Sequence, residues 1–247
     1  MELSTAHLAL GAVILLVAGL VRGLTGFGLA LVAVPFLSMF ISPKVVVPVI
    51  ILQTVGTNIP LVYRARAFVQ PGRIWPLVLG ALFGLPLGSA LLIWASSDTL
   101  RVLIGSVVTV FALALIAGLR VEVRNERLAF LPVGFTSGVL NGSSSLSGPP
   151  VILFFANQDV PPRIFRANII AYFFLTNLVA VALFWWRGLF THDVVLTALV
   201  LFPPLALGTG AGDLLSHRIN PGAFRVITLA VVLAAGLAAV ASGAGLV

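Results

Sequence analysis

Long uncharged runs constrain this chain more than any other feature of its sequence. Most of them are 18–24 residues long, close to the roughly 20 residues that a helix needs to cross about 30 Å of hydrocarbon. Lipid offers no hydrogen-bonding partner to the backbone, so continuous apolar runs predict helices, and the fold class is an all-α polytopic membrane protein. The uncharged runs are 3–21, 23–43, 45–63, 74–97, 102–119, 128–158, 167–186, 194–212 and 226–247.

The composition excludes the main soluble classes. Hydrophobic residues make up 60% of the 247 residues and charged residues only 9%, whereas soluble domains carry about 25% charged residues. The chain contains no cysteine, which excludes disulfides, thiolate metal sites and iron–sulfur clusters. Histidine and the acids form no group with metal-ligand spacing, and no nucleophile has a partner base. We therefore expect that the protein binds no metal and no cofactor and is not an enzyme.

One run does not have the length of a simple span. Residues 128–158 number 31, and glycines, serines and a pair of prolines occupy their middle. This is too long for one crossing and too short for two, so we predict a re-entrant hairpin of two half-helices. A broken backbone at membrane depth must be surrounded by protein or by a polar cavity. Residues 5–42 predict a similar hairpin, although two full spans remain an alternative there.

The basic residues predict the topology. Ten of them fall on one side and three, Lys44, Arg101 and Arg187, on the other, so the positive-inside rule places both termini outside the cytoplasm, in a cell (inner) membrane. The net charge of +7 is explained by this bias, and we expect a lipid bilayer as partner, no nucleic acid and a possible homo-oligomer. The ten are Arg64, Arg66, Arg73, Arg120, Arg124, Arg127, Arg163, Arg166, Arg218 and Arg225.

The chain also shows an internal repeat. At an offset of 115 residues Gly19 and Gly23 match Gly134 and Gly138; at 119, Thr57-Asn58 match Thr176-Asn177. We predict a first repeat, 1–119 (hairpin 5–42, spans 45–63, 74–97 and 101–119), and a second, 128–247 (hairpin 128–158, spans 167–186, 194–216 and 224–245). A returning hairpin plus three spans is an odd number of crossings, so the repeats are inverted. Inverted repeats with broken helices are typical of secondary transporters, whose substrate site lies between the repeats.

The two hairpin tips are the candidate binding site. Prolines 149 and 150 suit the first turn of a new helix, whose free N–H groups and positive dipole end would attract an anion. The alternative is that the small residues only allow tight helix packing. The candidate substrate-binding residues are Arg22, Thr25, Gly26, Gly28, Asn141, Gly142, Ser143, Ser144, Ser145, Ser147 and Gly148.

Further polar residues lie within the predicted spans. Arginine at membrane depth is costly and usually functional, but Arg22 would reach an interface if the first run were a full span. Asp213 is the candidate for proton coupling, with pairing to Arg218 as the structural alternative that we favour. Five residues either line a pathway or bond between helices: Gln53, Thr57, Asn58, Thr176 and Asn177.

The glycine-rich segments resemble those of the TauE/SafE sulfite exporter family, also called the 4-toluene sulfonate uptake permease family. The resemblance rests on Gly23-Leu-Thr-Gly26-Phe-Gly28 through Pro35, and on Ser137-Gly138 through Ser147-Gly148-Pro149-Pro150. The sequence differs from the usual family pattern at Leu29-Ala30 and Ser143-Ser144-Ser145, where family members commonly have more glycine. The resemblance implies transport of sulfite, sulfonates or other small anions across the inner membrane.

We therefore expect a secondary transporter that moves a small anion, sulfite-like, sulfonate-like or another organic anion, by alternating access at a site between the hairpin tips. A facilitative anion channel built from the same residues is the first alternative. A membrane accessory protein without transport activity is the second.

Overall fold

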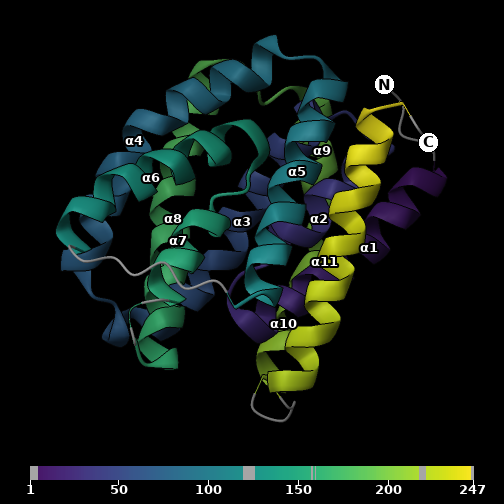
Figure 1. Ribbon diagram of the computed structural model, residues 1–247. Coiled ribbons are helices and arrows are strands. Elements are labelled where there is room, and N and C mark those ends of the chain that lie inside the picture. Colours follow the sequence, from purple (N-terminus) through teal and green to yellow (C-terminus); the bar gives the residue numbers. More distant parts are fainter. Residues whose placement is uncertain (1–4, 119–125, 157, 159, 217–220, 246–247) are drawn as a thin grey trace.

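The computed structural model describes residues 5–118, 126–156, 158, 160–216 and 221–245, which form α-helices and one short 3-10 helix and contain no strand (Figure 1). The first half contains α1 (Thr5–Thr25), α2 (Leu29–Ser38), α3 (Pro43–Ala65), η1 (Arg66–Phe68), α4 (Pro71–Trp94) and α5 (Ser97–Ile116). The second contains α6 (Glu126–Ser144), α7 (Gly148–Ala156), α8 (Pro162–Trp186), α9 (His192–Val200), α10 (Phe202–Leu215) and α11 (Pro221–Gly243).

The helices carry the lengths and the apolar surfaces of a multi-pass membrane protein. Within the described residues five helices are long and apolar enough to cross a membrane, or six if α9 and α10 together form one span. Large side chains point outward along them, for example Leu79, Phe83 and Leu87 on α4, which are 49%, 71% and 57% exposed. An outward face of this kind is stable against lipid and not against water. The start of α1 and the end of α11 lie at the same end of the bundle (Figure 1).

Glycines allow two pairs of helices to pack with their backbones in contact. Helix α1 packs against α10, and α4 packs against α6 (Figure 1). A Cβ added at Gly23 would lie 2.2 Å from the carbonyl oxygen of Thr209, and one added at Gly142 would lie 2.6 Å from that of Leu85. Only glycine permits such approaches, which explains the small-residue spacing. Each pair joins one half of the chain to the other.

The segment 194–216, which the sequence predicts as one span, is divided. Helices α9 and α10 meet at Leu201 with a bend of 41°. Prolines 203 and 204 occupy the first turn of α10, where their missing N–H groups cost nothing, and they cannot continue α9. The prolines therefore start a new helix rather than interrupt one.

Two further breaks separate α1 from α2 and α6 from α7. In the first break, residues 26–28, Gly26 and Gly28 have φ of 84° and 98°. In the second break, residues 145–147, Ser145 has φ of 58°, unusual for a residue other than glycine. The positive φ of Gly26 and Ser145, and the starts of α2 and α7, are each 119 residues apart. The offset of 115 used above for these segments is therefore corrected to 119.

Candidate functional site

A small cavity lies where the first break and the second break meet. Its volume is about 30 Å³, on the order of one or two water molecules. The polar residues on its wall are Arg22, Thr54, Ser145, Ser147 and Asn177. Apolar side chains, among them Phe27, Ile152 and Phe173, form the rest.

The cavity wall contains pairs of residues that lie 119 positions apart. Thr54 on α3 and Phe173 on α8 form one such pair, and the others come from the two breaks and the helix starts that follow them. Both halves of the chain thus supply residues to one small space, at positions 119 residues apart. The pairs at the breaks are Phe27 with Leu146, Gly28 with Ser147, Leu29 with Gly148 and Ala30 with Pro149.

Arg22 is the charged residue of this cavity. Its side chain is buried, with the residue only 2% exposed, and it comes from the last turn of α1. The Nη2 group donates to the Thr54 carbonyl oxygen at 3.4 Å and to Oδ1 of Asn58, while the Nε–H group has no partner among the described residues. The described carboxylates that form ion pairs do so elsewhere, so none of them neutralises Arg22. A buried charge without a counter-charge costs several kcal/mol, roughly.

Two helices begin at the cavity and add to its positive potential. The first N–H groups of a helix have no partner within the helix and carry the positive end of its dipole. Leu29, Ala30 and Leu31 of α2 and Gly148 and Pro149 of α7 all reach the wall. Helix α7 offers fewer N–H groups, because residues 149 and 150 are prolines. The site is therefore more positive on the side of α1 and α2.

A chain of hydrogen bonds supports the second break. The hydroxyl of Tyr172 on α8 donates to Ser137 Oγ at 2.7 Å. The hydroxyl of Ser137 in turn donates to the Ser147 carbonyl oxygen at 2.6 Å. Tyr172 and Ser137 are completely buried. In the first break, Thr25 Oγ1 accepts the N–H of Phe27 at 3.1 Å. Hydroxyl groups thus bind the backbone of both breaks.

Six of the candidate residues line the cavity: Arg22, Gly28, Ser145, Ser147, Gly148 and Asn177. Asn177 was expected on the pathway, and it reaches the cavity itself. Its Nδ2 donates to the Phe173 carbonyl oxygen at 2.7 Å, whereas its Oδ1 has no partner in the described chain.

Six other candidates near the breaks do not line this cavity. Ser143 and Ser144 donate to carbonyl oxygens of their own helix, those of Val139 and Leu140, because an apolar surrounding offers no better acceptor. Gly142 packs on α4, and Arg166 covers Gly26. Thr25 holds its own turn, and Asn141 is buried with neither side-chain amide atom bonded among the described residues.

The remaining pathway candidates lie within α3 and α8. Thr57 and Thr176 donate to the carbonyl oxygens of Gln53 and Tyr172, each four residues earlier. Asn58 accepts a hydrogen bond from Arg22 and so positions the guanidinium rather than lining the cavity itself. Gln53 donates to the Ala198 carbonyl oxygen at 3.3 Å and faces a groove beside α9, away from the cavity.

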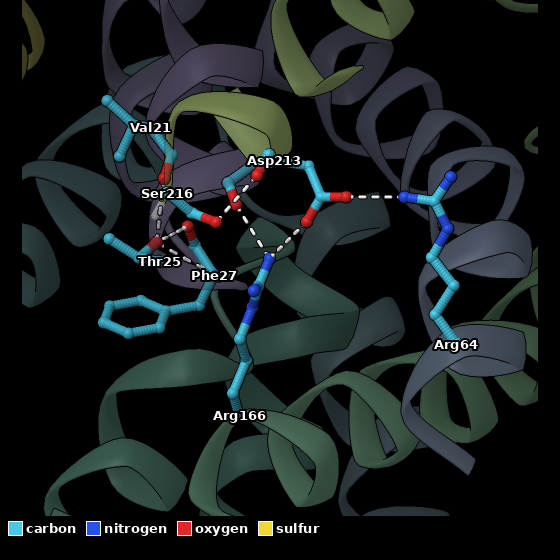
Figure 2. Close-up of polar contacts among 8 residues, drawn as sticks. Val21, Thr25, Phe27, Arg64, Arg166, Asp213 and Ser216 are labelled. Atoms are coloured by element: carbon cyan, nitrogen blue, oxygen red, sulfur yellow. Dashed lines mark hydrogen bonds and ion pairs between the residues drawn. The ribbon is translucent and has the colours of Figure 1, made fainter. Parts of the chain in front are cut away.

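Asp213 joins two arginines at the end of the bundle where α1, α3 and α10 end and α8 begins. Its Oδ2 lies 2.7 Å from Arg64 Nη1, and its Oδ1 lies 2.8 Å from Arg166 Nη2 (Figure 2). The partner favoured from the sequence, Arg218, lies outside the described residues. The sequence reading missed both observed partners, because they are 149 and 47 residues away.

The sequence reading also missed Thr54, Ser137 and Tyr172. The repeat offers a signal for one of them: at the corrected offset Gln53, a weak candidate, corresponds to Tyr172. Ser137 appeared only as part of a glycine-rich motif. Thr54 contributes a backbone carbonyl group, which no residue pattern predicts.

The fold and the cavity define a class first: a multi-pass helical membrane protein with a buried polar site built at broken helices, the arrangement of secondary transporters. The family model described as "Sulfite exporter TauE/SafE" matches residues 11–239. The chain therefore belongs to the TauE/SafE sulfite exporter family and is a membrane transporter. This fits the expectation that it is not an enzyme.

A curated relative supports the assignment. The probable sulfite/organosulfonate exporter TauE of Cupriavidus necator is 28% identical over 232 residues, which cover 86% of this chain and 85% of that protein. No solved structure matches the chain.

Proposed function

We propose that this protein is a secondary transporter that moves a small anion across the cytoplasmic membrane and binds it at Arg22, between the two breaks. The observation that carries the proposal is the buried Arg22 guanidinium, which faces a cavity and has no described carboxylate partner. Retaining such a charge is costly unless a ligand neutralises it. An anion bound here would receive charge-assisted hydrogen bonds from Arg22 and N–H groups from α2 and α7.

The chemistry of the wall supports a small oxyanion as substrate. An SO₃ group, as in sulfite or a sulfonate, has three acceptor oxygens for the guanidinium, the hydroxyls of Ser145 and Ser147, and the helix N–H groups. The apolar side chains Phe27, Ile152 and Phe173 would face a short organic substituent. The relative's name, sulfite/organosulfonate exporter, agrees with both forms. Because the cavity is small, a longer sulfonate requires these side chains to move.

The reciprocal packing supports two inverted repeats and alternating access. Gly19 faces the Leu205 carbonyl oxygen as Gly138 faces that of Ala81, so each broken-helix unit rests on a helix of the other half. The cavity lies between these units, and rocking of one against the other would open it to alternate sides. A cavity of about 30 Å³ favours a carrier over an open channel.

Direction and coupling follow from the same arrangement. We propose that the arginine-rich end faces the cytoplasm, which places both termini outside. An inside-negative potential would then drive export of a monovalent anion by about 2.3 kcal/mol per 100 mV without a coupling ion. Proton coupling through Asp213 stays a prediction, and an unchanged pH-gradient dependence in Asp213→Asn would exclude it.

Counterflow in proteoliposomes tests the proposal. Vesicles preloaded with unlabelled sulfite should transiently accumulate labelled sulfite, which a carrier shows and a channel does not. Ser147→Leu, which fills the cavity, should abolish counterflow, while Thr136→Leu on the exposed face of α6 should preserve it. Absence of counterflow for sulfite, methanesulfonate and other small anions would contradict a carrier.

A further inference from the structure

A cluster of charges lies beside the first break, outside the central cavity. Asp213 is in the last turn of α10, Arg64 in the last turn of α3 and Arg166 near the start of α8 (Figure 2). The Asp213 carboxylate contacts both guanidinium groups, at 2.7 and 2.8 Å. Arg166 Nη2 also donates to the Gly23 carbonyl oxygen at 2.8 Å.

Arg166 connects this cluster to the central site. Its side chain lies across Gly26: a Cβ added there would meet Arg166 Cγ at 2.8 Å and Nε at 3.2 Å. The next residues of the break, Phe27 and Gly28, line the cavity that Arg22 faces. The Nε–H of Arg166 is buried and has no partner among the described residues, so this side chain has a donor left for a ligand.

The cluster also joins two packed units. Asp213 and Gly23 belong to the glycine-packed pair α10 and α1, whereas Arg64 and Arg166 belong to α3 and α8, which pack against each other. The contacts of Asp213 with Arg64 and Arg166, and that of Arg166 with Gly23, all run between these two helix pairs. Breaking these contacts would release the two pairs from each other at the arginine-rich end, while Arg22 would still join α1 to α3 through Thr54 and Asn58.

We infer that Arg64 and Arg166 form a second anion-binding site at the entrance to the central cavity, and that the Asp213 carboxylate occupies it in the closed conformation. A small oxyanion arriving from the arginine-rich end displaces Asp213, binds the two guanidinium groups and is passed by Arg166 towards Arg22. The displaced carboxylate no longer holds the two helix pairs together, so binding opens the entrance. The inference rests on the proposed function, because it assigns the path to that site.

The cluster differs from an ordinary ion pair on the same protein. Arg73 and Glu126 join α4 to α6 at 3.3 Å with side chains 32% and 29% exposed, comparable to Arg166 and Asp213 at 29% and 20%. Arg166, however, lies across Gly26 of the first break, which Arg73 does not, and among the described residues Glu126 pairs with one arginine rather than two. Glu126→Gln is therefore a matched control for Asp213→Asn.

Methanesulfonate binding to the purified protein, measured by calorimetry at constant ionic strength, tests the inference. Since Asp213 competes with the ligand, Asp213→Asn should tighten the entrance site on the order of tenfold, and Glu126→Gln should not. Adding Arg64→Gln to Asp213→Asn should reverse the gain. Arg22→Gln removes the central site and should leave the gain in Asp213→Asn intact.

The outcomes separate the two proposals. If the wild type binds through Arg22 but Asp213→Asn binds no more tightly than Glu126→Gln, the entrance site is refuted and the central site stands. If Arg22→Gln changes nothing while Asp213→Asn still tightens binding, the entrance site stands without the central one. Should Asp213→Asn fail to fold, Arg64→Gln alone must still weaken binding relative to Arg73→Gln, and equal affinities would overturn the inference.

Discussion

Replacing Arg22 with glutamine is expected to remove the anion-dependent stabilisation that comes from the central site, while leaving the ligand-free protein at least as stable as the wild type. The Nη2 group of the guanidinium donates to Thr54 and Asn58, and its Nε–H has no partner among the described residues. A monovalent anion 4 Å from this charge gains about 4 kcal/mol at an effective dielectric constant of about 20. Losing that attraction weakens binding by about three orders of magnitude.

The stability of the ligand-free variant depends on the desolvation cost of the buried Arg22 charge. Arg22 is a buried cation without a described counter-charge, so removing the charge removes a desolvation cost. The glutamine amide can still donate to Asn58 or to the Thr54 carbonyl group, so neither acceptor need stay unpaired. We expect an unchanged or higher melting temperature without ligand.

Thermal unfolding of detergent-purified protein measures both effects. At a sulfite concentration 100 times the dissociation constant of the central site, the wild type should gain about 2.7 kcal/mol from that site, and Arg22→Gln almost none of this gain. Arg101→Gln, which loses an ion pair with Asp98 at the other end of the bundle, serves as control and should retain the gain. A strongly destabilised Arg22→Gln that still gains the full stabilisation from sulfite would show that Arg22 is a structural residue and does not bind the anion.

Three further variants test the fold and the site. Gly212→Ala should lower the free energy of unfolding by about 1–3 kcal/mol, because its Cβ would lie 2.3 Å from a backbone carbonyl oxygen of α1. The control Gly210→Ala in the same helix meets nothing within 4 Å and should raise the free energy of unfolding by up to about 1 kcal/mol. Tyr172→Phe should lower stability by about 1 kcal/mol and weaken sulfite binding several-fold, and exposed Tyr63→Phe should change neither. Since the chain has no cysteine, Ser147→Cys supplies a single thiol, and methanesulfonate, which does not react with thiol reagents, should slow its labelling by a charged thiol reagent; labelling unaffected by methanesulfonate would contradict a site at the second break.

The helices could be predicted from the sequence because charge spacing follows membrane thickness. The register of the two halves could not. Glycines recur every four residues at Gly19 and Gly23 and at Gly134, Gly138 and Gly142, so a slip of four keeps most matches. The contacts across the helix pairs, which equate Gly19 with Gly138, distinguish 119 from 115.

The residues that line the cavity could be predicted from the sequence only in part. Arg22, Ser145 and Ser147 reach the cavity, whereas Ser143 and Ser144 donate to their own helix. A hydroxyl in a helix surrounded by apolar groups satisfies itself locally, and residue type alone does not show which serine is left over. Ion pairs between distant segments, as at Asp213, are equally invisible in a single sequence.

The position of a bound anion in the structure would decide whether Arg22 binds the substrate. A crystal structure of the protein with 2-bromoethanesulfonate would place the ligand by the anomalous signal of bromine. A site at Arg22 predicts a peak in the cavity between α2 and α7, with the sulfonate oxygens within hydrogen-bond distance of Arg22, whether or not a second peak lies at Arg64 and Arg166. Ligand found only at other positions, with none at Arg22 and the cavity unchanged, would contradict a site at Arg22.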